Sequence, residues 1–370
     1  MQIKEFWNFR YKESLLDIEL GDINNNGDFE IVAISRTGTL VILSQKGEVI
    51  HQELISKDVP IWHLRIYDIN NDRNNELILG GMDGILRIFK CNLVYNLKKL
   101  WNHKFNSSIS GFLIEDINND NLSELIVYSL DKTIRVLNSL DGSLIWGQVF
   151  EDGIGDATIF SNDKKIILAG GNDGTIRTFN GMDGNLLWFK GFSNKIRCVS
   201  YLNSIKGLVV LCGGDDKKLH FINKETQTEF KTIEFEDYIW KCFSYPHPIL
   251  NNAIISSYSF DYFDNSIALE NRDFSSKIIC LNEAMEVKWE VKGFNIECLN
   301  IIEIHDKFLI CGGTTKGELI IFEEKTGRIL FKEIYNSCLN SIQFSTEKKM
   351  LFCGYDDGTI ISYKFEEIEN

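Results

Sequence analysis

The sequence predicts an all-β fold, a single eight-bladed β-propeller with four antiparallel strands in each blade. Three observations lead to this prediction. An apolar–turn–apolar segment recurs eight times, further apolar segments flank the copies, and the two ends of the chain complement each other. The chain has 370 residues, and one continuous core usually stops growing at roughly 250–300 residues. A repeat architecture therefore explains the length better than one enlarged core.

The recurring segment is an apolar run, a tight turn that is mostly rich in Asp and Gly, and a second apolar run. Asp-Gly and Asn-Gly tolerate the positive φ of hairpin turns, so each copy predicts a β-hairpin. The copies lie at 34–43, 79–89, 127–137, 168–179, 211–222, 310–322 and 352–363, and an eighth is split by an insertion into 253–260 and 276–281.

One further strand precedes each hairpin, and an outer strand that often carries Trp follows it. Clear inner strands are 61–69, 195–202, 296–304 and 337–344, and clear outer strands are 98–105, 142–150, 184–192 and 286–294. Four strands in roughly 45 residues is the period of a propeller blade. We expect one domain over 1–370, with blades at 14–55, 61–105, 109–150, 154–192, 195–235, 239–294, 296–334 and 338–365.

The two ends of the chain predict how the last blade is completed. The final repeat stops after its third strand, near Phe365, and residues 4–11 form a Trp-bearing outer strand with no hairpin before it. Pairing these segments would complete blade eight and remove two exposed sheet edges. Seven blades with a separate β-segment is the alternative.

The composition of the chain indicates which classes of binding partner and which cellular compartment to expect. The formal net charge of −14 disfavours nucleic acid and anionic membrane surfaces. No 18-residue apolar run and no apolar leader occur, so we expect no transmembrane segment. Nine cysteines without a leader predict free thiols in a reducing compartment, and we expect a cytoplasmic protein.

Several segments resemble known propeller repeats. Residues 338–363 resemble a WD repeat with Tyr363-Lys364 in place of its Trp-Asp pair, and 138–149 and 180–191 resemble the quinoprotein (PQQ-like) repeat. Residues 22–32, 68–80 and 116–127 are similar to the FG-GAP loops of integrin α-subunit propellers. Similar loops occur in propellers of the BBSome and KICSTOR complexes. The resemblance implies a protein partner, such as a small GTPase or a multi-subunit assembly.

The FG-GAP resemblance also implies three calcium loops, whose oxygen ligands alternate along the chain. Their sixth positions, Gly27, Arg73 and Asn121, should bend sharply, and a positive φ would strain Arg73. The alternative is that the Asn and Asp side chains close Asx-turns without a metal. Calcium is thus the one candidate cofactor, and no other is expected. The implied ligands are Asp22, Asn24, Asn26, Glu30, Asp68, Asn70, Asp72, Glu76, Asp116, Asn118, Asp120 and Glu124, with the Asp28 carbonyl.

Cysteines and histidines predict no metal cluster and no catalytic residues. Cys198, Cys242, Cys298 and Cys338 fall at similar places in four inner strands, which predicts a small apolar packing slot. Cys-x-x-Cys and His-x-x-x-His spacings are absent, and tetrahedral metal sites usually need them. The six histidines occupy unrelated blade positions with no nucleophile motif beside them.

Two features depart from the repeat pattern and predict a binding surface. Trp62 and Trp240 begin inner strands, whereas the other tryptophans lie on outer strands. The insertion 259–276 mixes aromatic and acidic residues, and it should emerge on the same face, beside the central mouth. The alternatives are that the tryptophans plug the channel and that the insertion folds back as a lid. The predicted partner-binding residues are Trp62, Trp240, Arg197, Glu297, Phe260, Tyr262 and Phe263.

These observations favour a non-enzymatic intracellular scaffold that binds protein through the central-mouth face. A quinoprotein-like enzyme and a calcium-binding FG-GAP module remain the two alternatives. The fold alone does not decide among them, because function depends on the site.

Overall fold

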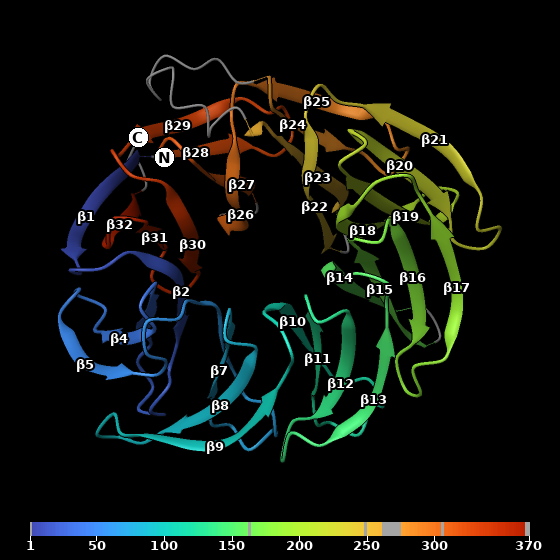
Figure 1. Ribbon diagram of the computed structural model, residues 1–370. Helices are drawn as coiled ribbons and strands as arrows, with labels where there is room; N and C mark the ends of the chain where they lie inside the picture. Colours follow the sequence, from blue (N-terminus) through green and yellow to red (C-terminus); the bar gives the residue numbers. More distant parts are fainter. Residues whose placement is uncertain (1, 162–163, 248–249, 261–274, 305–306, 367–370) are drawn as a thin grey trace. The chain divides into compact units, whose positions relative to one another are not determined.

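The computed structural model describes residues 2–161, 164–247, 250–260, 275–304 and 307–366. These residues form eight four-stranded antiparallel sheets and contain no α-helix (Figure 1). In each sheet the strands follow one another as the sequence predicts, from an inner strand to an outer one. The predicted fold class, an eight-bladed β-propeller, is confirmed.

Residues 1–106, 140–142 and 297–370 form one compact unit of the chain. It holds the sheets that we call blades one, two, seven and eight. Blade one is β2 (Leu15–Gly21), β3 (Glu30–Ser35), β4 (Thr39–Leu43) and β5 (Val49–Leu54); blade two is β6 (Ile61–Tyr67), β7 (Glu76–Gly81), β8 (Ile85–Cys91) and β9 (Leu97–Lys104). Blade seven is β26 (Ile296–Ile304), β27 (Lys307–Thr314), β28 (Glu318–Glu323) and β29 (Ile329–Ile334); blade eight is β30 (Leu339–Ser345), β31 (Met350–Tyr355), β32 (Thr359–Glu366) and β1 (Gln2–Arg10).

Residues 107–139 and 143–296 form the second unit, which holds blades three to six. Blade three is β10 (Ile109–Glu115), β11 (Glu124–Ser129), β12 (Thr133–Asn138) and β13 (Leu144–Val149); blade four is β14 (Ile154–Ser161), β15 (Lys165–Gly171), β16 (Thr175–Asn180) and β17 (Leu186–Gly191). Blade five is β18 (Ile196–Ser204), β19 (Gly207–Gly214), β20 (Lys218–Asn223) and β21 (Glu229–Glu234); blade six is β22 (Tyr238–His247), β23 (Leu250–Tyr258), β24 (Lys277–Leu281) and β25 (Val287–Lys292).

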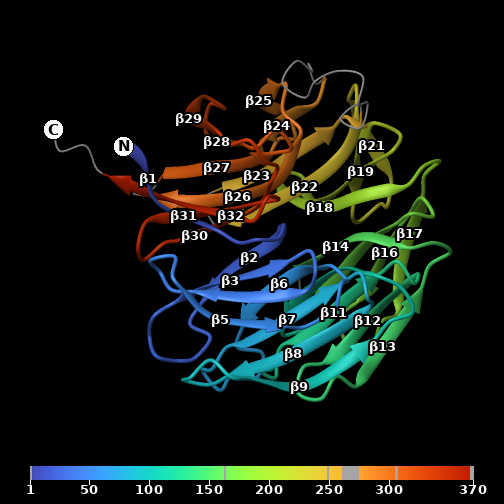
Figure 2. The same cartoon turned by 60° about the vertical axis from the view of Figure 1, so that its left-hand side comes forward.

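The N-terminal strand completes blade eight. β1 pairs antiparallel with β32, with a register that runs from Gln2 opposite Glu366 to Arg10 opposite Thr359 (Figure 2). The predicted pairing is therefore confirmed, and the alternative of seven blades with a separate β-segment is wrong. The pairing gives the last three-stranded repeat the fourth strand that its own sequence lacks.

The core lies between the faces of neighbouring blades. Side chains alternate across a strand, so both faces of each middle strand are covered. All residues of β3, β7 and β11 are buried. One cluster joins Leu15 and Val41 of blade one to Phe352 of blade eight, and another joins Leu168 of blade four to Val210 of blade five.

Outer-strand tryptophans contact the neighbouring blade in each unit. The Trp7 indole donates to the Gln45 carbonyl at 2.9 Å, and its ring covers Gly47. Trp146 donates to the Gly181 carbonyl at 2.7 Å. Its ring lies against Gly184, a turn residue with φ of 68°. The predicted outer-strand tryptophans thus serve as packing residues.

In the seven blades whose inner-strand pairing the described residues give, a β-bulge interrupts the start of the inner strand. The register shifts leave Leu16, Trp62, Ser110, Gly155, Arg197, Trp240 and Asn340 as the extra residues. A bulge redirects the side chain that it carries, and bulges are common beside functional sites. Three of the predicted partner-binding residues, Trp62, Arg197 and Trp240, occupy this position.

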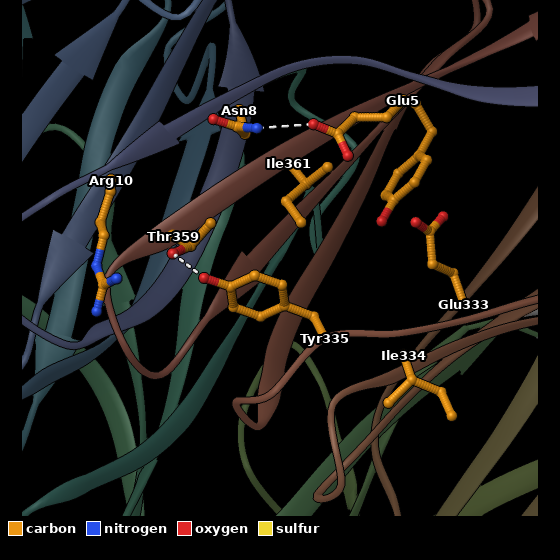
Figure 3. A pocket seen from close by; sticks show the side chains of 9 residues that line it. Glu5, Asn8, Arg10, Glu333, Ile334, Tyr335, Thr359 and Ile361 are labelled. Atoms are coloured by element: carbon orange, nitrogen blue, oxygen red, sulfur yellow. Dashed lines mark hydrogen bonds between the residues drawn. The ribbon is translucent and has the colours of Figure 1, made fainter.

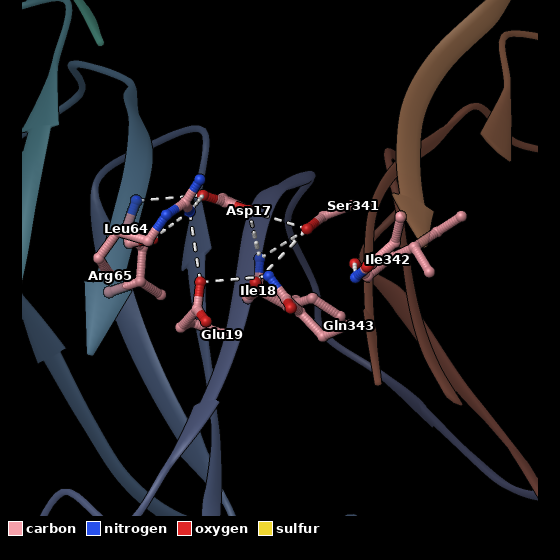
Figure 4. A network of polar contacts seen from close by, with 9 residues as sticks. Asp17, Ile18, Glu19, Leu64, Arg65, Ser341, Ile342 and Gln343 are labelled. Carbon is pink, nitrogen blue, oxygen red and sulfur yellow. Dashed lines mark hydrogen bonds and ion pairs between the residues drawn. The ribbon is translucent and has the colours of Figure 1, made fainter. Parts of the chain in front are cut away.

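The residue after the bulge links neighbouring inner strands by polar contacts. In the first unit, Asp17 accepts hydrogen bonds from the Leu64 backbone N–H at 3.1 Å and the Ser341 hydroxyl at 2.8 Å (Figure 4). In the second, Asp156 accepts from the Val199 backbone N–H at 2.9 Å. Burial raises the pKa of Asp17, and it raises the pKa of Asp156 to about 7.

Arg65 and Glu19 extend the first network. Arg65 Nη1 lies 3.5 Å from an Asp17 carboxylate oxygen and 3.3 Å from a Glu19 carboxylate oxygen. Gln343 donates to the same Glu19 oxygen at 3.1 Å (Figure 4). Burial raises the pKa of Glu19 to about 7, although the Arg65 charge opposes the shift.

Candidate functional site

The candidate site is an arginine–aromatic cluster, which we define as Arg197, Tyr238, Trp240, Tyr258 and Phe260. Arg197 and Trp240 come from the bulges of β18 and β22. Tyr258 ends β23, and Phe260 follows two residues later. The cluster therefore lies where the inner strands of blades five and six begin and where the insertion leaves blade six.

The aromatic rings of the cluster contact one another at several angles. The Trp240 and Tyr258 ring centroids are 5.1 Å apart, and those of Trp240 and Phe260 are 5.7 Å apart at an interplanar angle of 82°. Tyr238 and Phe260 are 5.3 Å apart at 68°. Edge-to-face packing of this kind stabilises aromatic groups beyond the burial of their area. Tyr258 is buried, whereas Tyr238, Trp240 and Phe260 are half-buried, so part of the cluster faces solvent.

Arg197 gives the cluster its charge. Its guanidinium carbon lies 5.2 Å from the Trp240 centroid, 5.4 Å from Phe260 and 6.0 Å from Tyr238. These distances are within the range of a cation–π interaction. Nε and Nη2 both donate to the Asp215 carboxylate, the second at 3.1 Å. The carboxylate and the rings hold the guanidinium in one place, so it is preorganised for a further contact.

Of the predicted partner-binding residues, the structure brings Arg197, Trp240 and Phe260 together. Trp62 is half-buried at the bulge of β6, and Glu297 is the second residue of β26. Both belong to the other unit, so a surface shared by Trp62 and Trp240 stays a prediction. Tyr262 and Phe263 lie outside the described residues.

Sequence reasoning missed two members of the cluster, Tyr238 and Tyr258, and also Asp215, which pairs with Arg197. The first two are strand-end residues in a chain with 12 tyrosines, and they have no local signature. Asp215 belongs to an Asp-rich turn, where such residues are turn formers by default. No local sequence signal could have found these three residues, because only the fold brings them beside Arg197 and Trp240.

The three acidic loops share one hydrogen-bonding pattern. In the first, the Asp22 carboxylate accepts from the backbone N–H groups of Asn26 at 3.1 Å and Gly27 at 2.8 Å. Asp68 and Asp116 make the equivalent pairs of bonds in the other two loops. The Asn24, Asn70 and Asn118 side chains each accept a backbone N–H two residues on. Such bonds form the Asx-turns of the alternative interpretation.

The backbone at the sixth position of each loop has the positive φ that a sharp bend needs. Gly27, Arg73 and Asn121 have φ values of 92°, 67° and 71°. Arg73 therefore adopts the left-handed conformation that is unfavourable for a bulky residue. Its backbone N–H donates to Asp68 at 2.7 Å, and this bond helps to hold the bend.

The ninth loop position is a buried glutamate in every loop. Glu30, Glu76 and Glu124 each accept a backbone N–H from the second loop residue. Burial raises the pKa of all three, that of Glu76 to about 7. In the second loop, Lys90 Nζ lies 2.9 Å from Asp72 and 4.0 Å from Glu76. This ammonium group supplies positive charge beside the oxygens that a cation would need.

The structure brings together no group of three or more His, Cys, Asp or Glu side chains that could hold a metal, as far as the described residues extend. Asp116, Asp120 and Glu124 are therefore not arranged as a carboxylate cluster. Calcium binding by these loops stays a prediction, and so does ligation by Asp22, Asn24, Asn26, Glu30, Asp68, Asn70, Asp72, Glu76, Asn118 and the Asp28 carbonyl.

The expected equivalence of the four inner-strand cysteines holds only for Cys198 and Cys298, each of which is the third residue of its inner strand. Cys198 pairs with Gly213 directly after the bulge, whereas Cys242 pairs with Ile255 one position later. Cys338 precedes β30. Side chains alternate between the two faces of a strand, so a shift of one residue moves a side chain to the opposite face. Cys242 and Cys338 therefore do not fill the slot that the position of Cys198 defines.

A small pocket of about 210 Å³ lies between β1, β29 and β32, and sequence reasoning did not find it (Figure 3). Glu5 and Glu333 line it, as do Arg10 and Tyr335. The Tyr335 hydroxyl is 2.9 Å from the Thr359 hydroxyl. Burial raises the pKa of Glu333, and the charge of Glu5 adds to the shift. The pocket exists only because β1 joins blade eight, so residues far apart in sequence line it.

Comparisons with known proteins bear on the fold. No family model matches the chain, and no curated protein matches its sequence. The computationally designed Ika8 protein is similar in structure, with a TM-score of 0.73, 14% identity, and coverage of 96% of this chain and 98% of that one. None of the described residues forms a helix that is long and apolar enough to cross a bilayer.

Two natural proteins have similar structures. Sqt1 of Saccharomyces cerevisiae, a WD-repeat protein, has a TM-score of 0.74 and 13% identity, with coverage of 99% of this chain and 100% of that one. The propeller protein BamB of Moraxella catarrhalis has a TM-score of 0.66 and 17% identity, with 100% of both chains covered. At these identities the likeness shows the fold alone, a β-propeller.

Proposed function

We propose that this chain is a non-enzymatic cytoplasmic scaffold that binds a protein partner through the arginine–aromatic cluster, where the inner strands of blades five and six begin. The observation that carries the proposal is the position of Arg197 and Trp240 on the bulges of two neighbouring inner strands. Bulges redirect side chains, and here they place a guanidinium and an indole 5.2 Å apart.

The chemistry of the cluster suits a protein interface. Trp, Tyr and Arg are the residue types that contribute most often to interface hot spots, because they bury large areas and also offer polar contacts. The Arg197 side chain is 27% exposed and that of Asp215 is 21% exposed. A partner that covers them would remove little water and would meet a charge pair already in place. The WD-repeat neighbour Sqt1 supports a scaffold only at the level of the fold.

The partner classes to test first follow from the sequence resemblance to the BBSome and KICSTOR propellers. They are a small GTPase and a subunit of a multi-subunit assembly. The net charge of −14 disfavours nucleic acid as the partner, because polyanions are repelled on average.

The test compares affinity capture from native lysate by the wild-type chain and by two variants, Trp240→Ala and Phe260→Ala. Loss of a buried aromatic anchor commonly costs about 2 kcal/mol or more, so recovery of the specific partner should fall at least about tenfold. The purified partner should then show the same loss in Kd by calorimetry.

The matched control is Phe189→Ala, which removes an aromatic side chain that is 62% exposed on outer strand β17 of the same unit. Its capture should equal that of the wild type. If Trp240→Ala and Phe260→Ala capture the same proteins as Phe189→Ala but have a lower Tm, the cluster is structural and the proposal is wrong.

A further inference from the structure

Two thiols of neighbouring blades face each other because of the register at the bulges. Cys198 is the first paired residue after the β18 bulge, and Cys242 is the second after the β22 bulge. Consecutive residues of a strand point to opposite faces. One side chain therefore points from blade five toward blade six, and the other points from blade six toward blade five.

The geometry of this pair is unusually close. The two sulfur atoms are 2.6 Å apart, which is nearer than unbonded sulfur atoms pack. A disulfide bond requires a separation of about 2.05 Å, so only a small movement separates this pair from a bond. The strands that carry the two residues pack along their length, and Ser200 and Ser244 make a second contact between them at 2.6 Å.

We propose that Cys198 and Cys242 are a disulfide-forming pair, a modification site that covalently joins the inner strands of blades five and six under oxidising conditions. This inference goes beyond the proposed function and does not rest on it. The co-reactant is a small peroxide, for which hydrogen peroxide is the probe.

The oxidation balances in two steps. Peroxide transfers one oxygen to the first thiol, which becomes a sulfenic acid, and one water leaves. The second thiol then attacks that sulfur, the S–S bond forms, and the hydroxyl leaves with the thiol proton as a second water. The two thiols lose two electrons and two protons in total, and the peroxide gains both.

Burial of the two thiols affects how fast they are oxidised, not which product forms. Burial raises the pKa of Cys242 well above its usual range, and the neighbouring Cys198 thiol adds to the shift. A buried thiol with few thiolate ions reacts slowly. We therefore expect the bond to form over hours of exposure. Once one sulfur is oxidised, its partner is already within reach.

The bond would also hold the arginine–aromatic cluster. Arg197 directly precedes Cys198, and Trp240 lies two residues before Cys242. A cross-link between these strands restrains the backbone that carries both side chains. It also closes a long loop of chain, which should raise the stability of the oxidised protein.

The experiment treats the full, reduced chain with hydrogen peroxide, blocks the remaining thiols and measures the intact mass and the non-reduced peptide map. We expect an intact mass that corresponds to seven blocked thiols instead of the nine of the reduced chain, a peptide that links Cys198 to Cys242, and a Tm higher by about 5 °C. Dithiothreitol should reverse all three changes. A map that links Cys198 to Cys212, or one with no cross-linked peptide, overturns the proposal.

Three variants test which cysteines form the cross-link. Each introduces the residue that another blade has at the equivalent position. Cys198→Ser introduces a serine, which blade eight has at the equivalent position, Ser341. Cys242→Ala and the control Cys212→Ala introduce alanines, which blade four has at the equivalent positions, Ala157 and Ala169. Under reducing conditions all three should melt close to the wild type. After oxidation only the wild type and Cys212→Ala should gain the cross-link and the higher Tm. A cross-link that persists in Cys198→Ser or Cys242→Ala contradicts the pairing.

Discussion

Trp146 and Gly184 show how single residues join two blades. The indole donates to the Gly181 carbonyl at 2.7 Å, and its ring lies over a turn that the Gly184 conformation makes possible. A Cβ atom at Gly184 would lie 2.6 Å from the ring. A φ of 68° also disfavours any L side chain. This position therefore requires glycine for two independent reasons.

We predict that Gly184→Ala destabilises the fold by about 2–4 kcal/mol, because the strain of the left-handed conformation adds to the displacement of the indole. Denaturant unfolding followed by Trp fluorescence would measure the change.

The control, Gly293→Ala, has φ of 93° but open space around its Cβ position. It should show only the conformational cost, about 1–2 kcal/mol. Equal losses in the two variants would mean that the Trp146 contact contributes nothing.

At the scale of the element, β1 is the strand on which closure of blade eight depends. It pairs along nearly its whole length with β32 and carries Trp7, which packs on blade one. Without β1, strand β32 would become an exposed edge. The pocket lined by Glu5, Arg10 and Glu333 would lose one of its walls as well.

Deleting residues 1–10 should therefore lower the Tm by about 5 °C or more, since the variant loses a full strand of pairing and apolar burial. Calorimetry or circular dichroism would measure the shift. An unchanged melting curve would show that closure by β1 contributes no stability.

A point variant separates this effect from surface charge. Lys4→Ala removes the exposed ion pair with Glu366 at 2.7 Å but leaves the strand in place. Its cost should stay below about 1 kcal/mol. A loss as large as that of the deletion would assign the effect to the ion pair rather than to the strand.

At the scale of the whole molecule, buried carboxyl groups make stability depend on pH. Burial raises the pKa of Glu19, Glu76 and Asp156 to about 7, from ordinary values near 4. The folded chain therefore keeps protons that the unfolded chain releases. The stability that these groups contribute is fully present below about pH 4 and is lost as the pH rises through about 7.

We predict that the free energy of unfolding falls between about pH 5.5 and pH 7.5, by on the order of 1 kcal/mol for each of these groups. Urea denaturation at several pH values would measure the slope. Asp156→Asn should flatten it, whatever the variant does to stability itself, because one titrating group is gone. A stability that rises over this interval would contradict the prediction.

The fold could be predicted from the sequence because its determinants are local. Asp-Gly turns and apolar runs specify each hairpin, and the period of the repeat specifies the blade. The unmatched strands at 4–11 and 359–365 indicated which ends pair. These signals lie within a few residues of one another, or repeat at a constant interval, so no distant contact had to be known.

The sites depended on contacts that only the folded chain supplies. Sequence reasoning placed Arg197 and Trp240 at the starts of inner strands, but the bulges decide where their side chains point. It treated Cys198 and Cys242 as equivalent, although their registers differ by one residue. That single residue decides which face of a strand a side chain occupies. A one-residue offset is invisible in the repeat pattern, yet it brings two sulfur atoms of neighbouring blades within 2.6 Å.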